Sequence, residues 1–500
     1  MRIKNTIRNS MYSVFFQLFT LIVGFFIPKL VIGTYGSEIN GLTTNVSQLI
    51  NLINLLQAGM IGASIFEMFG PIARQDYKLV GHIFFSSKKY FHRISYLFFV
   101  LTLVAIPYIL VVSKSSLDPA DVILSVLILG LNATLVFRYV CTYDVIFTAH
   151  QMKYTLVISS IIEKIVYYVL LFMVIFFRFN YLYMYVAALI ATVFRIGYLE
   201  CKYRSNYKSL IQQYEQLTDY KIRNQYRLFG NQLVQNILEA APTLLVTAVY
   251  GLTYASIYSV YLLIVNIFKM IFTTVQNSIA PSFGDLVASG NKQRILEVFN
   301  ILQMLFVVSS MIICSTMSVV YAPFIKLYCI DATEIQYVYN GLAIAMVLYL
   351  LLYIQFLVYN MMINSYGYYG KVIKTNILVG IISLVFAIVV TIFDFRYTYL
   401  GIALFYGISI IHRYILLKRE GIELSAKNFV RVFISLAFVL MTFVLSEKLV
   451  LQFNNWIEWF FKSAGMFFIS CVVAGIYIGI VERKEFSNLR HILIDVLKRR

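Results

Sequence analysis

Charged residues are scarce in this chain of 500 residues. Asp, Glu, Lys and Arg make up 13% of it, whereas soluble domains carry about 25%, and its mean hydropathy is +0.80. The few charges gather between apolar runs of about 20 residues, the length that crosses the hydrocarbon core of a bilayer. This scarcity excludes an ordinary soluble domain and predicts an all-α polytopic membrane protein.

Acidic residues, cysteines and histidines are also few. The chain has 23 acidic against 41 basic residues, five Cys and five His. No CxxC or HExxH spacing occurs, so we expect no disulfide framework, metal site or cofactor. A net charge of +18 would suggest nucleic acid in a soluble protein. Here the basic residues lie in short loops between apolar runs, where they set membrane topology, and we expect no nucleic-acid partner.

Fourteen transmembrane spans are predicted. A basic stub over 1–9 leads into an apolar run too long for a signal-peptide core, so we interpret it as an uncleaved first span. Loops on the side of the termini hold 29 Lys and Arg, and the opposite loops hold seven. The excess of basic residues predicts that both termini are cytoplasmic. The spans cover approximately 10–33, 41–66, 92–112, 120–148, 154–177, 180–200, 230–250, 253–282, 298–322, 339–365, 373–393, 397–417, 429–449 and 458–481.

The order of spans and loops predicts four parts. Lobes of six spans, 1–200 and 230–417, are joined by a cytoplasmic linker, 201–229, and a last part, 418–500, holds two further spans and a basic tail. The linker and the tail carry apolar residues at helical spacing among charges, which predicts amphipathic helices at the membrane surface. These apolar residues are Leu210, Tyr214 and Leu217 in the linker, and Phe486, Leu489, Ile492, Leu493 and Val496 in the tail.

An internal repeat relates the two lobes. Tyr35-Gly36 precedes a polar-striped span that ends at Phe69-Gly70, and Tyr250-Gly251 precedes another that ends at Phe283-Gly284. Each copy holds six spans, an even number, so both copies have the same orientation. This predicts two parallel lobes related by an axis along the membrane normal, with a central cavity between them.

Polar side chains follow one face of the first, second, seventh and eighth spans. Lipid offers these groups no hydrogen-bond partner, so each stripe must face protein or water. The stripes therefore predict a polar cavity. Their members are Asn9, Ser13, Gln17, Thr20 and Gly24; Ser47, Asn51, Asn54 and Ala58; Gln232, Gln235, Glu239, Thr243 and Thr247; and Asn266, Lys269, Thr273 and Gln276.

Five ionisable residues fall within the cytoplasmic-side third of their spans: Arg138, Glu163, Lys164, Glu239 and Lys269. A charge at mid-bilayer costs about 2.5–3.5 kcal/mol, so we expect Glu163 to pair with Arg138 or Lys164, and Glu239 with Lys269. One positive charge then remains, which suits an anionic group such as a diphosphate. A neutralising pair without any function also explains Glu239 and Lys269.

Prolines, further charged residues and tyrosines within the spans have functional or structural interpretations. Pro28 and Pro242 each break a backbone hydrogen bond within a span, and act either as hinges or as tolerated kinks. Arg195, Asp144, Glu67 and Arg413 lie nearer the inner surface and can reach headgroups. Some tyrosines can stack on sugar rings, although most aromatics in such chains form interfacial belts; candidates are Tyr12, Tyr168, Tyr258, Tyr261, Tyr349 and Tyr353.

Two stretches resemble a known family. NSMYSVFFQLFTLIVGFFIPKLVIGTYGSEINGL (Asn9–Leu42) resembles the opening of bacterial polysaccharide repeat-unit (O-antigen and capsule) flippases of the multidrug/oligosaccharidyl-lipid/polysaccharide exporter superfamily. YGLTYASIYSVYLLI (Tyr250–Ile264) and IAPSFGDLVASGN (Ile279–Asn291) are similar to the second-lobe signature of that family. Where relatives often carry an acidic residue before the apolar core of the seventh span, this chain has Glu239 with Pro242 behind it.

The resemblance implies a flippase rather than an enzyme. Such a protein moves an undecaprenyl-diphosphate-linked oligosaccharide from the inner to the outer leaflet of the bacterial cytoplasmic (inner) membrane by alternating access. The implied partners are this substrate, membrane lipids, a polysaccharide polymerase and a chain-length regulator, with the flippase itself a monomer. Coupling to H⁺ or Na⁺ would involve Glu239 and Glu163. The expected substrate contacts are Lys269, Arg138, Lys164, Asn266, Gln17, Asn51, Asn54, Gln235 and Thr273.

Three other functions share some of these sequence features. An ion-coupled drug or small-molecule antiporter of the same superfamily has the same architecture, with a drier and more acidic cavity. A major-facilitator transporter has twelve spans and a charged loop after the second, which GPIARQDYKLVG (70–81) fits poorly. A polymerase or glycosyltransferase needs a sizeable external loop with paired carboxylates or arginines, and only Asp118 and Asp121 approach that pattern.

Overall fold

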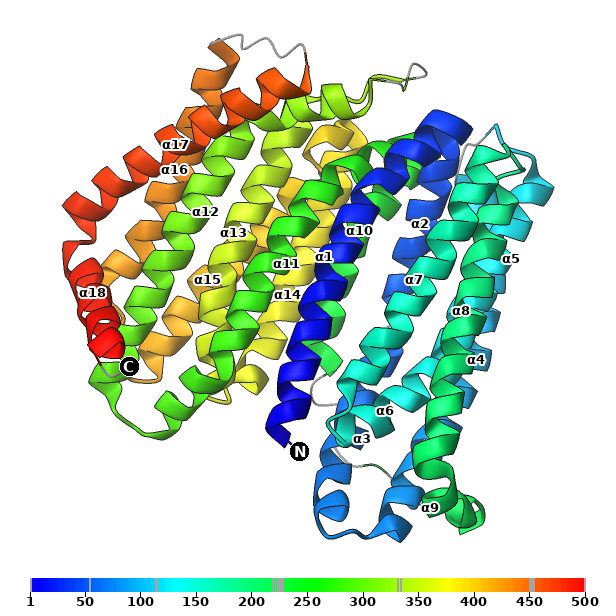
Figure 1. Cartoon of the computed structure of the whole chain (residues 1–500). Helices are drawn as coiled ribbons and strands as arrows, with labels where there is room; N and C mark the ends of the chain where they lie inside the picture. Colours follow the sequence, from blue (N-terminus) through cyan, green and yellow to red (C-terminus); the bar gives the residue numbers. More distant parts are fainter. Residues whose placement is uncertain are drawn as a thin grey trace. The chain divides into compact units, whose positions relative to one another are not determined.

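The computed structural model describes residues 2–53, 55–112, 116–217, 220, 222, 229–330, 332, 335–448 and 455–498. Within these ranges the chain is almost entirely helical and contains no β-strand (Figure 1). Thirteen described segments are long and apolar enough to cross a bilayer, and the shorter helices α2 (Ser37–Ile53) and α3 (Leu55–Ala73) cover the second predicted span. The prediction of an all-α polytopic membrane protein is confirmed.

Residue contacts divide the chain into two units, Met1–Ser259 and Val260–Arg500. The long helix α11 (Leu252–Ala288) begins in the first unit and continues in the second. The other elements of the first unit are α1 (Arg2–Tyr35), α4 (Tyr77–Val112), α5 (Pro119–Leu135), η1 (Val136–Val140), α6 (Cys141–Ala149), α7 (Lys153–Phe176), α8 (Leu182–Tyr203), η2 (Arg204–Lys208), α9 (Ser209–Ile211), η3 (Gln212–Leu217) and α10 (Phe229–Tyr250).

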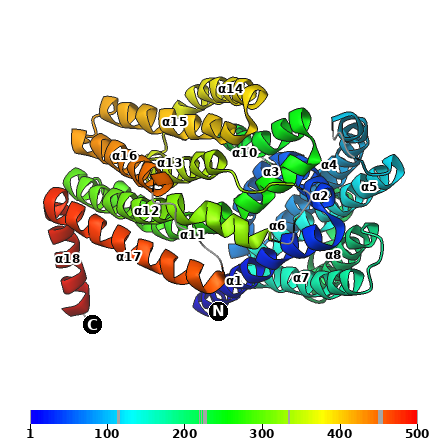
Figure 2. The ribbon, with the colours of Figure 1, turned by 90° about the horizontal axis from the view of Figure 1, so that it is seen from above.

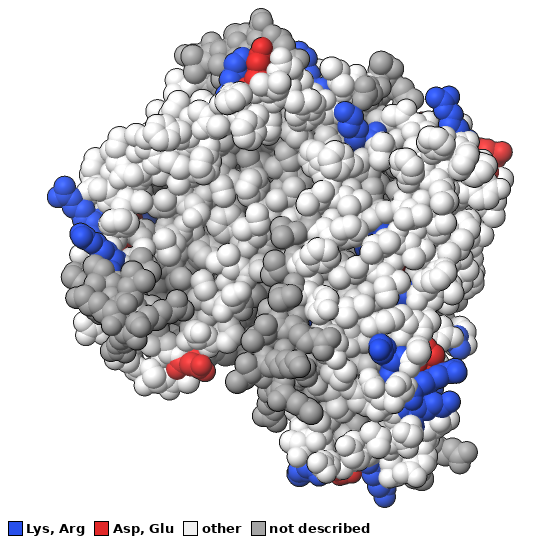
Figure 3. Space-filling model, in the orientation of Figure 1, with Lys and Arg blue, Asp and Glu red and all other residues white. Residues whose placement is uncertain are grey.

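The first unit buries one apolar face of each helix and exposes another. Phe84, Phe91 and Phe137 lie in a fully buried aromatic core contributed by α4 and η1. On α7, by contrast, exposed apolar side chains recur at helical spacing, including Val169 and Phe172. Such a face is expected of a helix that contacts lipid or another apolar surface. Figure 3 shows that the drawn face of this unit is mostly uncharged between its two ends, with many of its Lys and Arg side chains gathered toward the end where α9 lies.

The second unit is built around α13 (Asn340–Ser365). In the apolar stretch of this helix, 78% of the residues are buried. It packs against neighbouring helices on several sides, as Figure 2 shows. Because α13 meets protein all round, its sequence is apolar on every face and shows no helical stripe. The other elements of this unit are α12 (Lys292–Tyr328), α14 (Tyr369–Phe393), η4 (Phe395–Tyr397), α15 (Tyr399–Arg419), α16 (Ala426–Lys448), α17 (Trp456–Val481) and α18 (Arg483–Lys498).

The two Tyr-Gly pairs of the sequence repeat form the same turn. Gly36 has φ +89° and Gly251 has φ +98°, a backbone region that favours glycine. The amide of Gly36 donates to the carbonyl of Ile32 at 3.0 Å, and that of Gly251 to the carbonyl of Thr247 at 2.9 Å. Each glycine thus ends one helix and lets the next begin immediately, so the repeated motif has a repeated geometry.

Close packing brings α2 against the start of α11 within the first unit. A Cβ on Gly41 would overlap the backbone carbonyl of Leu252. One residue earlier, the buried Asn40 donates through Nδ2 to Ser256 Oγ and Ser259 Oγ, both at 2.7 Å. We call Asn40, Ser256 and Ser259 the serine clasp. Glycine at position 41 allows the approach that the clasp requires.

Replacing Gly41 by Ala is expected to destabilise the first unit by about 1–3 kcal/mol, the usual effect of overfilling a packed contact. The added methyl group meets backbone rather than a flexible side chain, so the helices must separate. Thermal unfolding in detergent measures the effect. Gly33→Ala is the matched control, because a Cβ on this helical glycine meets nothing within 4 Å; equal melting temperatures for the two variants would contradict the expectation.

Ion pairs at the junction of α17 and α18 hold three helices of the second unit together. Arg431, 1% exposed, binds Glu482 in a bidentate pair with Nε–Oε1 2.8 Å and Nη2–Oε2 2.6 Å. Its Nη1 donates to Gln303 Oε1 at 2.9 Å, and Lys427 Nζ lies 3.0 Å from Glu482. Arg431 therefore links α12, α16 and the end of α17.

The pH dependence of stability should reflect Glu482. Burial raises the pKa of this carboxyl, but the hydrogen bonds and charges of Arg431 and Lys427 outweigh burial, so its pKa lies below the ordinary 4.5. A lowered pKa contributes stability that is complete above the unfolded value and is lost as the pH falls through the folded value. We expect the melting temperature to fall on acidification below about pH 4.5. Glu482→Gln should flatten this part of the profile, and an unchanged profile would contradict the assignment.

One expectation about an intramembrane residue is corrected here. Arg413 does not reach a membrane surface: it is fully buried in the second unit, with its guanidinium 4.3 Å from the ring centre of Phe356. Packing between helices decides which side chain is buried, and sequence position alone does not specify it.

The linker is helical through Leu217 and continues α8. Tyr207 and Ile211 are buried in it, and Leu210 is 40% exposed. Its position at the membrane surface stays a prediction.

Candidate functional site

Lys269 and Thr273 are brought together with two tyrosines in the second unit. Lys269 Nζ lies 4.8 Å from the ring centre of Tyr353 and 5.4 Å from that of Tyr349. Thr273 Oγ1 is 2.9 Å from the hydroxyl of Tyr353. Lys269 and Thr273 are one helical turn apart on α11, and the tyrosines are one turn apart on α13, so two helical faces meet. We call these four residues the lysine–tyrosine cluster.

The cluster joins a cation to groups that can hold polar ligands. A tyrosine ring attracts an ammonium through its quadrupole, by about 0.5–2 kcal/mol, and carries no net charge of its own. Tyrosine hydroxyls donate and accept hydrogen bonds. Lys269 is partly buried, so an anion that reaches it meets a positive charge together with aromatic faces and hydroxyl groups.

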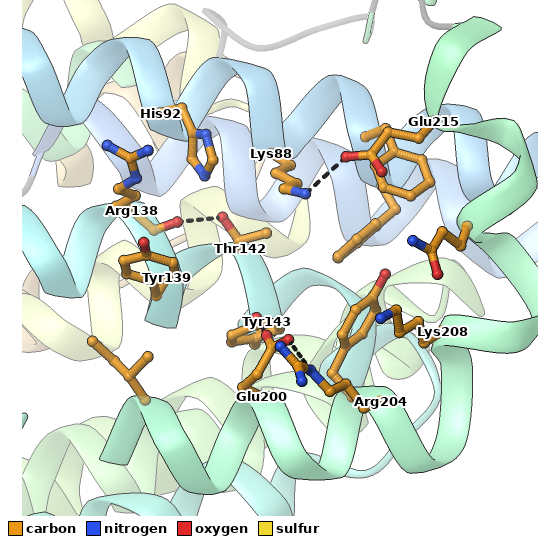
Figure 4. A pocket seen from close by; sticks show the side chains of 15 residues that line it. Lys88, His92, Arg138, Tyr139, Thr142, Tyr143, Glu200, Arg204, Lys208 and Glu215 are labelled. Carbon is orange, nitrogen blue, oxygen red and sulfur yellow. Dashed lines mark hydrogen bonds and ion pairs between the residues drawn. The ribbon is translucent and has the colours of Figure 1, made fainter. Parts of the chain in front are cut away.

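Arg138 lies in a pocket at one end of the first unit. It belongs to η1, a turn of π-helix between α5 and α6, a distortion often found at functional sites. Its Nη1 donates to the hydroxyl of Tyr96 at 3.1 Å, and the guanidinium lies 5.4 Å from the Tyr96 ring centre and 5.7 Å from that of Tyr139. Figure 4 shows it with His92 and Lys88 of α4 beside the pocket.

Lys164 of α7 has a similar aromatic surrounding. Its Nζ lies 5.9 Å from the ring centres of both Tyr167 and Tyr168. Neither Lys164 nor Arg138 forms an ion pair within the part of the chain that the structure describes. Both cations are thus placed within span sequences with tyrosine rings as their neighbours.

The expected pairing of Glu163 with Arg138 or Lys164 is wrong. Glu163 Oε2 lies 2.8 Å from Arg195 Nη1, and Thr192 Oγ1 donates to Glu163 Oε1 at 3.2 Å. Arg195 and Thr192 are on α8, which packs along α7. Because these consecutive helices pack side by side, Arg195 becomes the ion-pair partner of Glu163. From its position in the sequence, Arg195 was expected near the inner surface.

The remaining predicted residues are distributed over both units. Gln17, Gln235 and Glu239 are partly buried in the first unit; Asn51 there and Asn266 in the second are exposed, and Asn54 lies outside the described residues. Pro28 and Pro242 lie inside continuous helices, α1 and α10. Their roles as substrate contacts, coupling group or hinges stay predictions, as does the pairing of Glu239 with Lys269.

Part of the polar stripe on the seventh predicted span is buried away from solvent. Thr243 and Thr247 are 0% and 2% exposed, and Thr247 Oγ1 donates to the carbonyl of Thr243 at 2.8 Å. A threonine that bonds to its own helix needs no water. These two residues of the stripe face protein rather than lipid, as expected, but they line no water-filled surface.

Sequence reasoning missed the residues around Arg138. Lys88, Arg204 and Lys208 were assigned to topology-setting loops, yet all three line the pocket with Arg138. The available signal was the spacing of Lys88 and His92, one helical turn apart, followed by Tyr96 on the same face. Which distant segment would cover that face could not be known from spacing.

No protein-family model and no curated protein sequence matches this chain. Solved structures do match. An inward-facing multidrug resistance MATE family transporter of the MOP superfamily has 11% sequence identity and a TM-score of 0.64, covering 86% of this chain and 96% of its own. The lipid II flippase MurJ, inward closed conformation, has 16% identity and a TM-score of 0.63, covering 94% and 99%.

An outward-facing MATE family transporter also matches, with 11% identity, a TM-score of 0.55 and coverage of 85% of this chain and 96% of its own. Identities this low define the fold alone. The chain therefore shares the polytopic helical fold of these MATE transporters and of the lipid II flippase MurJ.

Proposed function

We propose that this protein is a flippase that moves an undecaprenyl-diphosphate-linked oligosaccharide from the inner to the outer leaflet by alternating access, for export of a cell-surface polysaccharide. One observation carries the proposal: cations within the spans lie on tyrosine rings. Keeping a charge there costs about 2.5–3.5 kcal/mol. Lys164 bears this cost without an acidic partner among the described residues, which favours an anionic substrate group.

The lysine–tyrosine cluster supports the same substrate class. A lipid-linked oligosaccharide presents a diphosphate next to sugar rings. Lys269 can attract the diphosphate, while Tyr349 and Tyr353 offer aromatic faces and hydroxyl groups to the glycan. One solved structure of the same fold is a lipid II flippase, which supports a lipid-borne substrate for this chain.

A multidrug antiporter is the second candidate function. It is favoured by an apolar hollow of about 370 Å³ in the second unit, whose lining includes Phe268, Tyr321, Phe324, Trp459 and Phe460. An apolar drug would fit such a lining. The cations Lys164 and Lys269 do not suit cationic drugs, and for that reason we favour the flippase.

The proposed orientation places both termini in the cytoplasm. It is supported by the 29 basic residues in loops on the terminal side against seven on the other, in a bacterial cytoplasmic membrane. With this orientation the substrate enters from the side of the linker and the basic tail.

Deletion of the gene tests the function directly. We expect lipid-linked repeat units to accumulate in the inner leaflet, and the wild-type gene to restore their export. Purified protein in liposomes should move a labelled undecaprenyl-diphosphate oligosaccharide across the bilayer. Unchanged lipid-linked intermediates together with increased sensitivity to drugs would overturn the flippase and favour the antiporter.

A further inference from the structure

The pocket around Arg138 has features that suit a phosphate group at a membrane surface. It has a volume of about 540 Å³ and is lined by α4, η1, α6, α8 and the helical linker. Its outer wall is the charged segment that follows the apolar part of α8, so it lies at the end of the unit rather than within the apolar span. We call it the surface pocket; Figure 4 shows its side chains.

Its charges leave a positive excess. The basic side chains are Lys88, Arg138, Arg204 and Lys208, and the acidic ones are Glu200 and Glu215. Lys88 pairs with Glu215 at 2.9 Å, and Arg204 pairs with Glu200 at 2.5 Å. Arg138 and Lys208 form no ion pair in the described ranges. Two positive charges are thus left to attract an anion.

One hydrogen-bond donor of the pocket also lacks a partner. Arg138 Nε is buried and has no hydrogen-bond partner in the structure, a costly arrangement for a charged group. Tyr139 lies beside it in the pocket wall, whereas the Thr142 hydroxyl already donates to the carbonyl of Arg138 at 2.8 Å. A phosphate group offers several acceptor oxygens to a guanidinium and an ammonium at once.

The surface pocket continues toward the lipid-facing side of α4. A second hollow of about 300 Å³ shares Lys88, His92 and Glu215 with it and is also lined by Arg93 and Tyr96. Beyond Tyr96, which is 61% exposed, exposed apolar residues follow on the same helical face, Val100 at 52% and Val104 at 65%. An acyl or polyprenyl chain can lie along this face.

We propose that the surface pocket binds the phosphate-bearing headgroup of a membrane lipid, with the hydrocarbon chain along α4. The positive excess selects the phosphate, and the adjoining apolar face selects a lipid over a soluble phosphate. The lipid is either the polyprenyl diphosphate carrier or a bulk anionic phospholipid, which share this chemistry. The site lies within the first unit alone. The carrier-lipid alternative rests on the proposed function, and the phospholipid alternative does not.

Native mass spectrometry of the purified protein tests this site with three probes: undecaprenyl diphosphate, phosphatidylglycerol and inorganic pyrophosphate. Lys208→Gln and Arg138→Gln should each weaken lipid binding about tenfold, the effect of one lost hydrogen bond to a charged group. Lys202→Gln is the matched control, because Lys202 is exposed on the same helical segment and outside the pocket, and it should leave binding unchanged.

The outcomes separate the possible ligands. Binding of undecaprenyl diphosphate but not phosphatidylglycerol assigns the site to the carrier lipid, and binding of phosphatidylglycerol assigns it to phosphate-bearing lipids in general. Pyrophosphate bound as tightly as either lipid overturns the role of the α4 face. Equal lipid affinity in the wild type, Lys208→Gln and Arg138→Gln overturns the site. A wild type that binds these lipids and translocates no lipid-linked oligosaccharide overturns the proposed function alone.

Discussion

Arg431→Ala is expected to lower the free energy of unfolding by about 3–5 kcal/mol, the largest stability effect we foresee. The substitution leaves Glu482, which is 0% exposed, buried without its bidentate partner. It also removes the donor to Gln303 at 2.9 Å. Thermal unfolding of the purified protein in detergent measures the loss as a lower melting temperature.

A surface ion pair provides the control. Lys371 lies 2.6 Å from Glu420, with exposed fractions of 48% and 26%. Exposed pairs contribute about 0–1 kcal/mol, so Lys371→Ala should change stability little. If Arg431→Ala melts like Lys371→Ala, the buried pair does not hold α12, α16 and α17 together. Glu482→Gln combined with Arg431→Met should recover part of the loss, since no buried charge is then left unpaired.

Lys269→Ala is expected to slow translocation of a lipid-linked oligosaccharide by about 10-fold to 100-fold. This range corresponds to the ~1.5–3 kcal/mol of a hydrogen bond to a charged group, here the proposed contact with the diphosphate. The measurement is the initial rate in liposomes per reconstituted protein. Lys269→Arg keeps the charge over Tyr353 and should retain most of the rate.

Two further variants separate charge from packing. Tyr353→Phe keeps the ring beneath the ammonium but removes the hydroxyl that lies 2.9 Å from Thr273, so it should reduce the rate less than Lys269→Ala. Lys326→Ala removes an exposed cation on α12 and should leave the rate unchanged. Normal translocation by Lys269→Ala at normal expression would remove Lys269 from the substrate site.

The sequence was sufficient for the membrane class and for the repeated turn. Apolar length predicts spans because the bilayer thickness is fixed, and Gly36 and Gly251 mark the breaks because few other residues adopt their backbone conformation. Apolar length and the backbone conformation of a glycine are properties of a single segment, so predicting them does not require knowing which helices become neighbours.

Side-chain partners could not be predicted in the same way. Glu163 was expected to pair with Arg138 or Lys164, but it pairs with Arg195, since the contact between α7 and α8 depends on how each helix is rotated about its axis. The spacing of Lys269 and Thr273 correctly placed them on one face. It could not reveal Tyr349 and Tyr353 opposite, because α13 is apolar all round and shows no distinguishing stripe.

The serine clasp fixes the rotation of the first turns of α11 about the helix axis. Two hydroxyl groups of this helix, on residues three positions apart, accept hydrogen bonds from the single side-chain amide of Asn40. Turning these residues about the helix axis would carry both hydroxyl groups away from Asn40 together, so the clasp specifies which face of the helix α2 covers.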